Sequence, residues 1–500
     1  MSHWRETTRF SSSQWFLFLS VALLVLFRSA VLTFWPQSHF DSDQAIFGLM
    51  AKHLAEARAF PVFMYGQTYI LGVEAWLAAP IFLVAGASVA ALKLPLLVIN
   101  VAIAMLLAWI FTRQVGLRPS LAVVATLFFV LSAPGTTTNF LAASGGNVEP
   151  FLYIILIWLT RYRPNWGGLV LGIGFLQREF TIYGLVALLG LEAARGVLFT
   201  RDGMVRRLKM FRTAAEVWLV VTWMKQYSSA AGPGTSLQDL YKAAPADNLG
   251  ELWSRICIDP SRLAAGVWTG LTVHIPQLFG VASQPLLEYG IDSNAKQGLP
   301  LGGLLLVALF GIAIVRIGMT VAGARKWNAE YDACAYLVLA GGLSFAAFTM
   351  LRCGVIATMR YELLSILGAT GLAAWYLRVE RVKAIAVAWT AMLIVWAAST
   401  SSAHVRLWAE YLAHPPVGAK RMVIRQLEAR GTRYAYADYW LAYYITFLSN
   451  EQIIVHSTDL SRVATYRDIV DAHRTEAVRI SRTACAGGRE VMSGVYFCPP

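Results

Sequence analysis

Two aspartates, Asp41 and Asp43, stand just after the first long apolar run of the sequence. Asp41 with Gln44 three residues later has the spacing of a helix capping box, and Asp43 in the first turn suits the helix dipole. A carboxylate fixed at a membrane surface also suits a general base, or a metal ligand, beside a lipid-borne substrate. Both interpretations hold together, because a capped helix start is a rigid mount for a reactive side chain.

A second charged pair, Arg178 and Glu179, separates two apolar runs without a glycine or proline turn of its own. A charge near the bilayer centre costs about 3 kcal/mol, so we expect this pair near the end of a span or beside a cavity. From the residues alone, the two side chains could form an ion pair with each other at the outer interface.

The elements that carry these residues are predicted to be membrane helices. The 500 residues are 57% hydrophobic and 14% charged, and the mean hydropathy is +0.54. This composition excludes an ordinary water-soluble protein. Apolar runs that approach the ~20 residues of a membrane span recur as far as about residue 400. We therefore predict a polytopic α-helical membrane protein.

The net charge of +13 would suit a nucleic-acid-binding protein, but the basic residues flank apolar runs, as the positive-inside rule requires. We therefore expect membrane lipids as partners and no nucleic acid. Arg5 and Arg9 precede the first run, and no small-residue cleavage site follows it. This arrangement predicts an uncleaved span with a cytoplasmic N-terminus.

Counted from that orientation, the basic clusters give about eleven spans. We place them near residues 15–35, 93–113, 119–134, 148–160, 165–177, 180–200, 211–226, 299–318, 333–351, 362–378 and 384–400. The run at 73–86 is apolar too, but a crossing there would put Arg113 and Arg118 outside. We therefore interpret it as a re-entrant or interfacial segment.

This topology divides the chain into a membrane domain, residues 1–400, and an extracytoplasmic C-terminal domain, residues 401–500. Two large outer loops follow, 36–92 and 227–298. The first half of the first loop has an apolar face that includes Ile46, Leu49 and His53, which predicts an amphipathic helix in the membrane interface.

The C-terminal segment is polar and mixed, and we expect a small α/β domain. Its aromatic residues could form a sugar-stacking platform or the core of that domain: Tyr434, Tyr436, Tyr439, Trp440, Tyr443 and Tyr444.

The cysteines agree with this topology. Cys257 and Cys353 fall on the outer side, and Cys485 and Cys498 are either bridged or two free thiols. Cys334 is expected to be a small buried residue in a span.

The string DQAIFGLMAKHL, followed by YGQTY and GASVAALKLP, resembles the first outer loop of the GT-C glycosyltransferases. More narrowly it resembles the glycosyltransferase family 39 group, with the protein O-mannosyltransferases and the lipid A aminoarabinose transferases. That group has D-E-A-x-Y-A, a helix, a Y-G or N-G turn, and G-x-S-x-x-A-x-R-L-P. The resemblance implies a GT-C membrane domain with interfacial helices in this loop.

Asp43 falls on the acidic residue of that pattern, which implies that it activates the acceptor or holds a divalent metal, Mg²⁺ or Mn²⁺, near the donor phosphate. Gln44 replaces a common Glu, and Lys93 replaces a common Arg. GVEAW at 72–76 replaces a stretch that often contains proline. The second carboxylate therefore stays open, with Glu74 ahead of Asp41.

The resemblance also implies substrate contacts. SGGNVEP resembles the outer end of the family's fourth helix, where an acidic residue faces the active-site cavity, and Arg178 stands near a common Thr-Lys. Arg360-Tyr361 resembles an Arg-Tyr pair before a late helix. Glu149 could instead be a solvated helix cap, and Arg360 a snorkelling arginine beside an interfacial tyrosine. The candidate substrate-binding residues are Tyr65, Gln67, Glu74, Asn147, Glu149, Arg178, Arg360 and Tyr361.

The sequence has no Gly-rich phosphate loop, no Rossmann fingerprint and no His or Cys cluster at zinc spacing. These absences favour a sugar donor delivered by lipid. The resemblance implies transfer, with inversion, from polyprenyl phosphate to a protein, lipid or cell-envelope glycan outside a bacterial inner membrane. Asp43 would act on the acceptor hydroxyl, and Arg178 and Arg360 would stabilise the departing phosphate.

A transporter or flippase of a lipid-linked sugar is the alternative from another class. Transporters often have paired halves with interrupted helices, and the sequence has no such repeat. A receptor or an assembly scaffold is a third interpretation, but it leaves the first outer loop unexplained.

Overall fold

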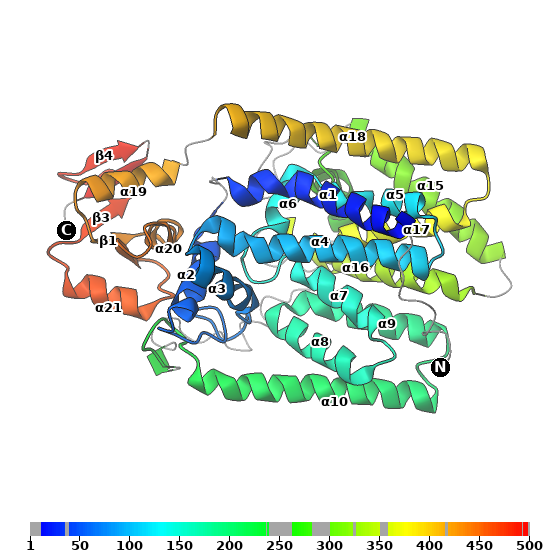
Figure 1. Ribbon diagram of the computed structural model, residues 1–500, viewed down its shortest axis with the longest axis horizontal. Helices are drawn as coiled ribbons and strands as arrows, with labels where there is room; N and C mark the ends of the chain where they lie inside the picture. The colour runs from blue at the N-terminus through cyan, green and yellow to red at the C-terminus, as the bar shows by residue number, and fades with distance from the viewer. Residues whose placement is uncertain are drawn as a thin grey trace.

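The computed structural model describes residues 12–35, 40–236, 238–239, 263–282, 301–323, 327–350, 359–415, 419–492 and 494–498. Figure 1 shows an elongated bundle of helices with an α/β unit at one end, which contains the C-terminus. The helices α2 and α3 lie between the bundle and this unit. They are Ser42–Ala55 and Val73–Ala85.

Each predicted span contains a helix. These helices are α1 (Ser12–Phe34), α4 (Val89–Arg113), α5 (Pro119–Val130), α7 (Glu149–Leu159), α8 (Pro164–Gln177), α9 (Ile182–Ala194), α10 (Arg201–Met224), α15 (Leu301–Gly323), α16 (Asp332–Met350), α17 (Ser365–Val379) and α18 (Lys383–Ala413). Within the described ranges, five helices are long and apolar enough to cross a membrane, or up to six if the bent pair of α5 and α6 (Pro134–Phe140) is one span. The count of eleven stays a prediction.

Two helix boundaries differ from the sequence prediction. The helix α10 begins at Arg201 rather than near 211, so the basic residues between Arg201 and Lys209 lie in the first half of this helix. The helix α18 runs past residue 400 to Ala413, where Leu407 and Tyr411 still pack into the core. The last long helix therefore extends into the segment assigned to the C-terminal domain.

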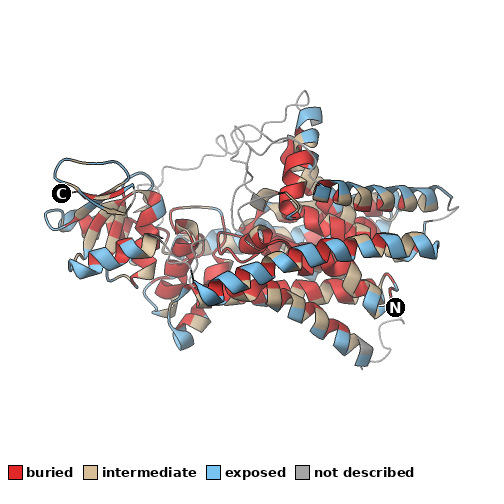
Figure 2. Ribbon diagram, turned by 90° about the horizontal axis from the view of Figure 1, so that it is seen from above, coloured by how far each residue is buried: buried red, intermediate tan, exposed pale blue. Residues whose placement is uncertain are grey.

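Apolar side chains cover the outside of the bundle as well as its inside. Figure 2 shows exposed residues along the outward faces of the long helices. They include Phe16 on α1, Leu304 on α15 and Val387 on α18. Exposure of so much apolar surface to water would cost free energy, whereas the hydrocarbon chains of lipids can cover it. The chain is an integral membrane protein.

The helix α2 is buried within the protein. Asp41 caps its start by accepting a hydrogen bond from the Gln44 backbone N–H at 3.0 Å, as the capping-box spacing predicts. Nearly all residues from Ser42 to His53 are buried, including the polar ones. The α/β unit packs on α2, so the helix has no exposed polar face of the kind that an amphipathic helix at a membrane surface has. Its depth relative to the bilayer stays a prediction.

The α/β unit follows α18 in sequence. Its elements are α19 (Ala419–Ala429), β1 (Tyr434–Ala437), α20 (Tyr439–Leu448), β2 (Ile454–Ser457), α21 (Ala464–Ala472), β3 (Val478–Ser481), β4 (Arg489–Met492) and β5 (Val495–Cys498). The sheet order is β2-β1-β3-β5-β4. The strand β1 is parallel to β2 and β3, whereas β5 is antiparallel to β3 and β4.

The disulfide between Cys485 and Cys498 is present and closes the last turn of this unit, which confirms the bridged alternative. Cys334 is buried in α16. Cys257 and Cys353 lie outside the described residues, as does most of the second outer loop.

The remaining short helices connect these elements. They are η1 (Glu179–Thr181), η2 (Lys225–Tyr227), α13 (Leu263–Thr269), η4 (Gly270–His274), α14 (Ile275–Leu278), η5 (Ala329–Tyr331) and η6 (Met359–Tyr361). Two of these connectors bear on the candidate site. The connector η1 begins with Glu179, directly after Arg178, and η6 contains Arg360.

Candidate functional site

Asp43 lies in the first turn of α2 and meets a residue from the far end of the chain. The Tyr439 hydroxyl donates a hydrogen bond to Oδ1 of Asp43. In the part of the chain that the structure describes, Oδ2 of Asp43 has no hydrogen-bond partner. Arg360 is close enough to both Asp41 and Asp43 to be stabilised by their charges. The carboxylate of Asp43 therefore has one fixed oxygen, one open oxygen and a cation nearby.

Asp41 is the N-terminal cap of α2, and its carboxylate is engaged in that role. Burial, followed by the charge of Asp43, raises the pKa of Asp41 to about 6, and hydrogen bonds from Gln44 oppose this shift. Lys420 on α19 attracts the same carboxylate. The structure thus gives Asp41 the capping role that its spacing with Gln44 predicts.

Glu74 lies at the start of α3 and accepts hydrogen bonds from two successive glycines in the loop before α7. Its Oε2 accepts a hydrogen bond from the Gly145 N–H at 2.8 Å, and its Oε1 accepts one from the Gly146 N–H at 3.0 Å. Both glycines have positive φ, +88° and +93°, where other residues are strained. The carboxyl group of Glu74 is 1% exposed. It holds the loop before α7 in place.

Glu149 lies near Glu74, close enough for the two buried carboxyl groups to interact. Two carboxylates so placed would repel each other. Glu149 also accepts hydrogen bonds from Gln177 Nε2 at 3.2 Å and from the Val148 N–H at 3.1 Å. A solvated helix cap is therefore excluded for Glu149, which is 1% exposed.

Arg178 lies at the break between α8 and η1, beside this carboxyl pair. A Cβ at Gly146 would be 3.1 Å from the Cβ of Arg178. The guanidinium lies over the ring of Phe180, 5.1 Å from its centroid, and is nearly buried. No carboxylate pairs with it among the described residues, and Glu179 points to the surface. The ion-pair alternative is therefore not what the structure contains.

Aromatic rings join Arg178 to Arg360. The edge of Phe180 meets Tyr361 at 5.7 Å, and the Arg360 guanidinium is 5.1 Å from the centroid of the Tyr361 ring. Stacking over an aromatic face leaves the edge of a guanidinium available to an anion. The structure thus brings both predicted phosphate-binding arginines into one array.

Three other candidates have structural contacts. The Tyr65 hydroxyl is 2.9 Å from Nδ1 of His53, which lies ~15 Å along α2 from Asp43 at the rise of an α-helix. Asn147 donates to the Asn139 carbonyl at 3.0 Å and to Ser144 Oγ at 3.1 Å. The structure therefore does not bring Tyr65 to the carboxylates, and Gln67 lies in the same turn as Tyr65.

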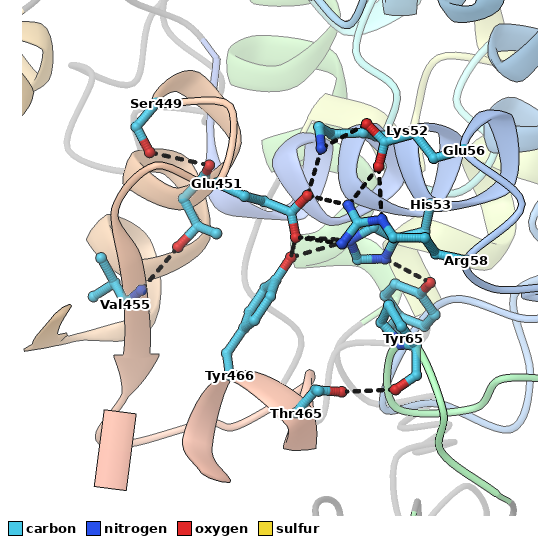
Figure 3. Close-up of polar contacts among 12 residues, drawn as sticks. Lys52, His53, Glu56, Arg58, Tyr65, Ser449, Glu451, Val455, Thr465 and Tyr466 are labelled. Atoms are coloured by element: carbon cyan, nitrogen blue, oxygen red, sulfur yellow. Dashed lines mark hydrogen bonds and ion pairs between the residues drawn. The ribbon is translucent and has the colours of Figure 1, made fainter. Parts of the chain in front are cut away.

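Glu451 is a residue that the sequence analysis missed. Figure 3 shows its carboxylate between the basic side chains of α2 and Tyr466 of the α/β unit. It accepts hydrogen bonds from Lys52 Nζ at 2.6 Å, from Tyr466 at 2.8 Å and from Arg58, and it lies 3.0 Å from Nε2 of His53. This set of contacts is called the Glu451 cluster below. Two polar residues, Lys52 and His53, inside an otherwise apolar helix were the available signal.

The six aromatic residues of the C-terminal segment divide between the core and the surface, with Tyr434 and Tyr436 half-buried. Tyr439, Tyr443 and Tyr444 are buried, whereas Trp440 is 47% exposed. Tyr439 is also the partner of Asp43, which no local pattern indicates.

A divalent metal at Asp43 stays a prediction. No group of three or more His, Cys, Asp or Glu side chains with the geometry of a metal site occurs within the described ranges. The open Oδ2 of Asp43 can supply one oxygen ligand, and a donor phosphate would have to supply others.

Comparison with known proteins adds evidence on the fold. No family model matches the sequence, and no curated protein matches it. Among solved structures, the chain is similar to the crystal structure of ArnT from Cupriavidus metallidurans in the apo state, with a TM-score of 0.51 and 12% sequence identity. The likeness covers 93% of this chain and 92% of that chain. Because the match spans the bundle and the α/β unit alike, the chain shares the overall fold of that structure.

Proposed function

We propose that this protein is a membrane glycosyltransferase that transfers a sugar from a polyprenyl-phosphate donor to a hydroxyl group outside the cytoplasm. One observation carries the proposal. Asp43 presents an open carboxylate oxygen near Arg360, and the aromatic array connects Arg360 to Arg178, which has no carboxylate partner among the described residues. A base beside two cations suits a reaction in which a phosphate leaves as a hydroxyl attacks.

The proposed reaction is a single displacement. The acceptor O–H gives its proton to Oδ2 of Asp43 as the acceptor oxygen bonds to the anomeric carbon. The bond between that carbon and the phosphate oxygen breaks, and its electron pair leaves with the polyprenyl phosphate. Attack opposite the leaving group inverts the anomeric centre. The arginines stabilise the second negative charge that the phosphate gains.

The acceptor class follows from the resemblance only in outline and includes a protein, a lipid or a cell-envelope glycan. In the alternative to the base role, Asp43 would hold a divalent metal, Mg²⁺ or Mn²⁺, together with the donor phosphate, and the metal would withdraw charge from the phosphate. The predicted site is the extracytoplasmic face of a bacterial inner membrane.

The test uses the full chain in liposomes, with radiolabelled polyprenyl-phosphate hexoses and pentoses as donors and host membrane extract as the source of acceptors. Asp43→Asn keeps the size of the side chain but removes the base, so we expect transfer to fall roughly 100- to 10,000-fold. The matched control is Asp468→Asn, the same change at a carboxylate that is 67% exposed.

Two results would contradict the proposal. If Asp43→Asn folds and transfers as fast as the wild type, Asp43 is not the base. If the wild type transfers no sugar from any of these donors but carries a lipid-linked sugar across the liposome, the protein is a flippase.

A further inference from the structure

The helix α20 of the α/β unit lies along α2, and their contacts occur at three levels. At the start of α2, the Tyr444 N–H donates to Ser42 Oγ at 3.3 Å. Halfway along, a Cβ at Gly48 would lie 2.5 Å from the Phe447 ring. At the far end, the Glu451 cluster joins the turn after α20 to Lys52 and His53. The two helices are therefore packed against each other in a single, fixed register.

This register places Tyr439, the first residue of α20, against Asp43. The Tyr439 backbone N–H donates to Asp459 Oδ1 at 2.7 Å, and the Asp438 side chain caps the helix through the Trp440 N–H at 2.9 Å. The ring lies edge-on to its neighbour Tyr443, with centroids 5.4 Å apart. The Tyr439 side chain is 5% exposed and cannot swing away without unpacking α20.

We propose that Tyr439 is a positioning residue that orients the Asp43 carboxylate for the transfer reaction, so that the α/β unit completes the active site. This inference rests on the proposed function. The hydrogen bond from Tyr439 to Oδ1 restricts the rotation of the carboxylate and leaves Oδ2 available to an acceptor hydroxyl. Reaction rates depend steeply on such alignment, because a 1 Å displacement of a reacting group costs about 100-fold.

The chemistry of the tyrosine suits this role. Burial, followed by the charge of Asp43, raises the pKa of Tyr439 well above its ordinary value. The phenol therefore stays protonated and remains a donor throughout the working pH range. It cannot compete with Asp43 for the acceptor proton, because a neutral phenol is a very weak base.

The opposite role is that Tyr439 occupies the place of the acceptor hydroxyl and keeps the site closed. The two roles predict opposite effects on the rate. A positioning residue raises kcat, whereas an occupant of the acceptor place lowers the rate at subsaturating acceptor.

The experiment compares Tyr439→Phe with Tyr444→Phe in the liposome assay. Both changes remove one hydroxyl from a buried tyrosine on α20, but only the first touches Asp43. We expect Tyr439→Phe to lower kcat about 10- to 100-fold, with an unchanged KM for the donor. Tyr444→Phe should stay within twofold of the wild type. Tyr439→Met, which fills the space with a flexible apolar chain, should show the same fall and serves as the second variant.

A double-mutant cycle separates positioning from general loosening. If Tyr439 acts through Asp43, the variant with both Tyr439→Phe and Asp43→Asn should be no slower than Asp43→Asn alone. A merely structural tyrosine would give multiplied losses, which would overturn the proposal. An unchanged kcat in folded Tyr439→Phe would overturn it, and so would a higher rate.

The failure of this inference differs from the failure of the proposed function. In the first case the wild type transfers sugar and Tyr439→Phe matches it. In the second case the wild type itself transfers none, which would overturn both.

Discussion

Arg178 is the residue whose surroundings are hardest to explain by packing alone. It is nearly buried, lies over Phe180, and has no carboxylate partner among the described residues. A buried cation without a paired anion is costly, so the burial of Arg178 calls for a ligand that supplies the opposite charge. A lipid-linked phosphate has the required sign and the oxygen geometry for a guanidinium.

Replacement of Arg178 by methionine should weaken donor use. Charge-assisted hydrogen bonds contribute about 1.5 to 3 kcal/mol, so we expect kcat/KM for the polyprenyl-phosphate donor to fall roughly 10- to 100-fold. Initial rates at a series of donor concentrations measure this change. The exposed Arg474→Met is the control, and an Arg178→Met protein with wild-type kcat/KM would remove Arg178 from the donor site.

At the scale of elements, the loop before α7 depends on two glycines that clasp Glu74. Gly145 has φ +88°, and a Cβ there would lie 2.6 Å from Cγ2 of Ile70. The position thus excludes a side chain for two independent reasons, backbone conformation and space. The loop in turn sets the positions of Glu149 and Arg178.

Gly145→Ala should therefore destabilise the protein by about 1 to 3 kcal/mol, from backbone strain and the clash with Ile70. The midpoint of thermal unfolding in detergent measures this effect. Gly318→Ala is the matched control, because Gly318 lies in the helix α15 and a Cβ added there would meet no atom within 4 Å. We expect the Gly318→Ala protein to be as stable as the wild type or more stable. If the two variants had the same midpoint of thermal unfolding, the proposed role of Gly145 in holding Glu74 would be wrong.

The sequence predicts these elements unevenly. Hydropathy and the flanking arginines locate the helices. Each span makes its backbone hydrogen bonds within the same segment, so it appears in the sequence as one continuous apolar run. The capping of α2 by Asp41 is equally local. The burial of α2 is not, because its partner α20 lies about 400 residues away, and Lys52 and His53 do not indicate which residue pairs with them. Asp43, Glu149 and Arg178 could be proposed because they fall on the pattern of a known family, whereas Tyr439 could be identified only as an aromatic residue.

At the scale of the whole molecule, the Glu451 cluster holds the α/β unit against the membrane domain. Burial tends to raise the pKa of Glu451, but hydrogen bonds from His53 and Arg58 outweigh this and hold it far below its ordinary value. Burial lowers the pKa of His53. Both groups take up protons more readily when the unit is undocked, so docking is stabilised as pH rises.

Docking should therefore weaken as pH falls from 7 to 4. The contribution of His53 declines below about 6.5, its unfolded value, and that of Glu451 declines once the pH drops below about 4.3. Hydrogen exchange of the α20 amides as a function of pH measures docking. Glu451→Gln leaves Lys52 and Arg58 less well paired and should raise α20 exchange by an amount equivalent to about 3 kcal/mol at pH 7.

The control for this change is the exposed Glu476→Gln, which should leave exchange in α20 unaltered. If Glu451→Gln protects α20 as well as the wild type does, the cluster does not hold the unit in place.

The bond between Tyr439 and Asp43 also has a consequence for biosynthesis. The two residues are 396 positions apart, so at ordinary elongation rates the ribosome makes the tyrosine roughly 20 to 80 s after the aspartate. During that interval the nascent chain has its carboxylate but lacks the residue that orients it. A polypeptide that stops early, or whose last segment never crosses the bilayer, would draw on the lipid carrier pool much more slowly than the finished protein.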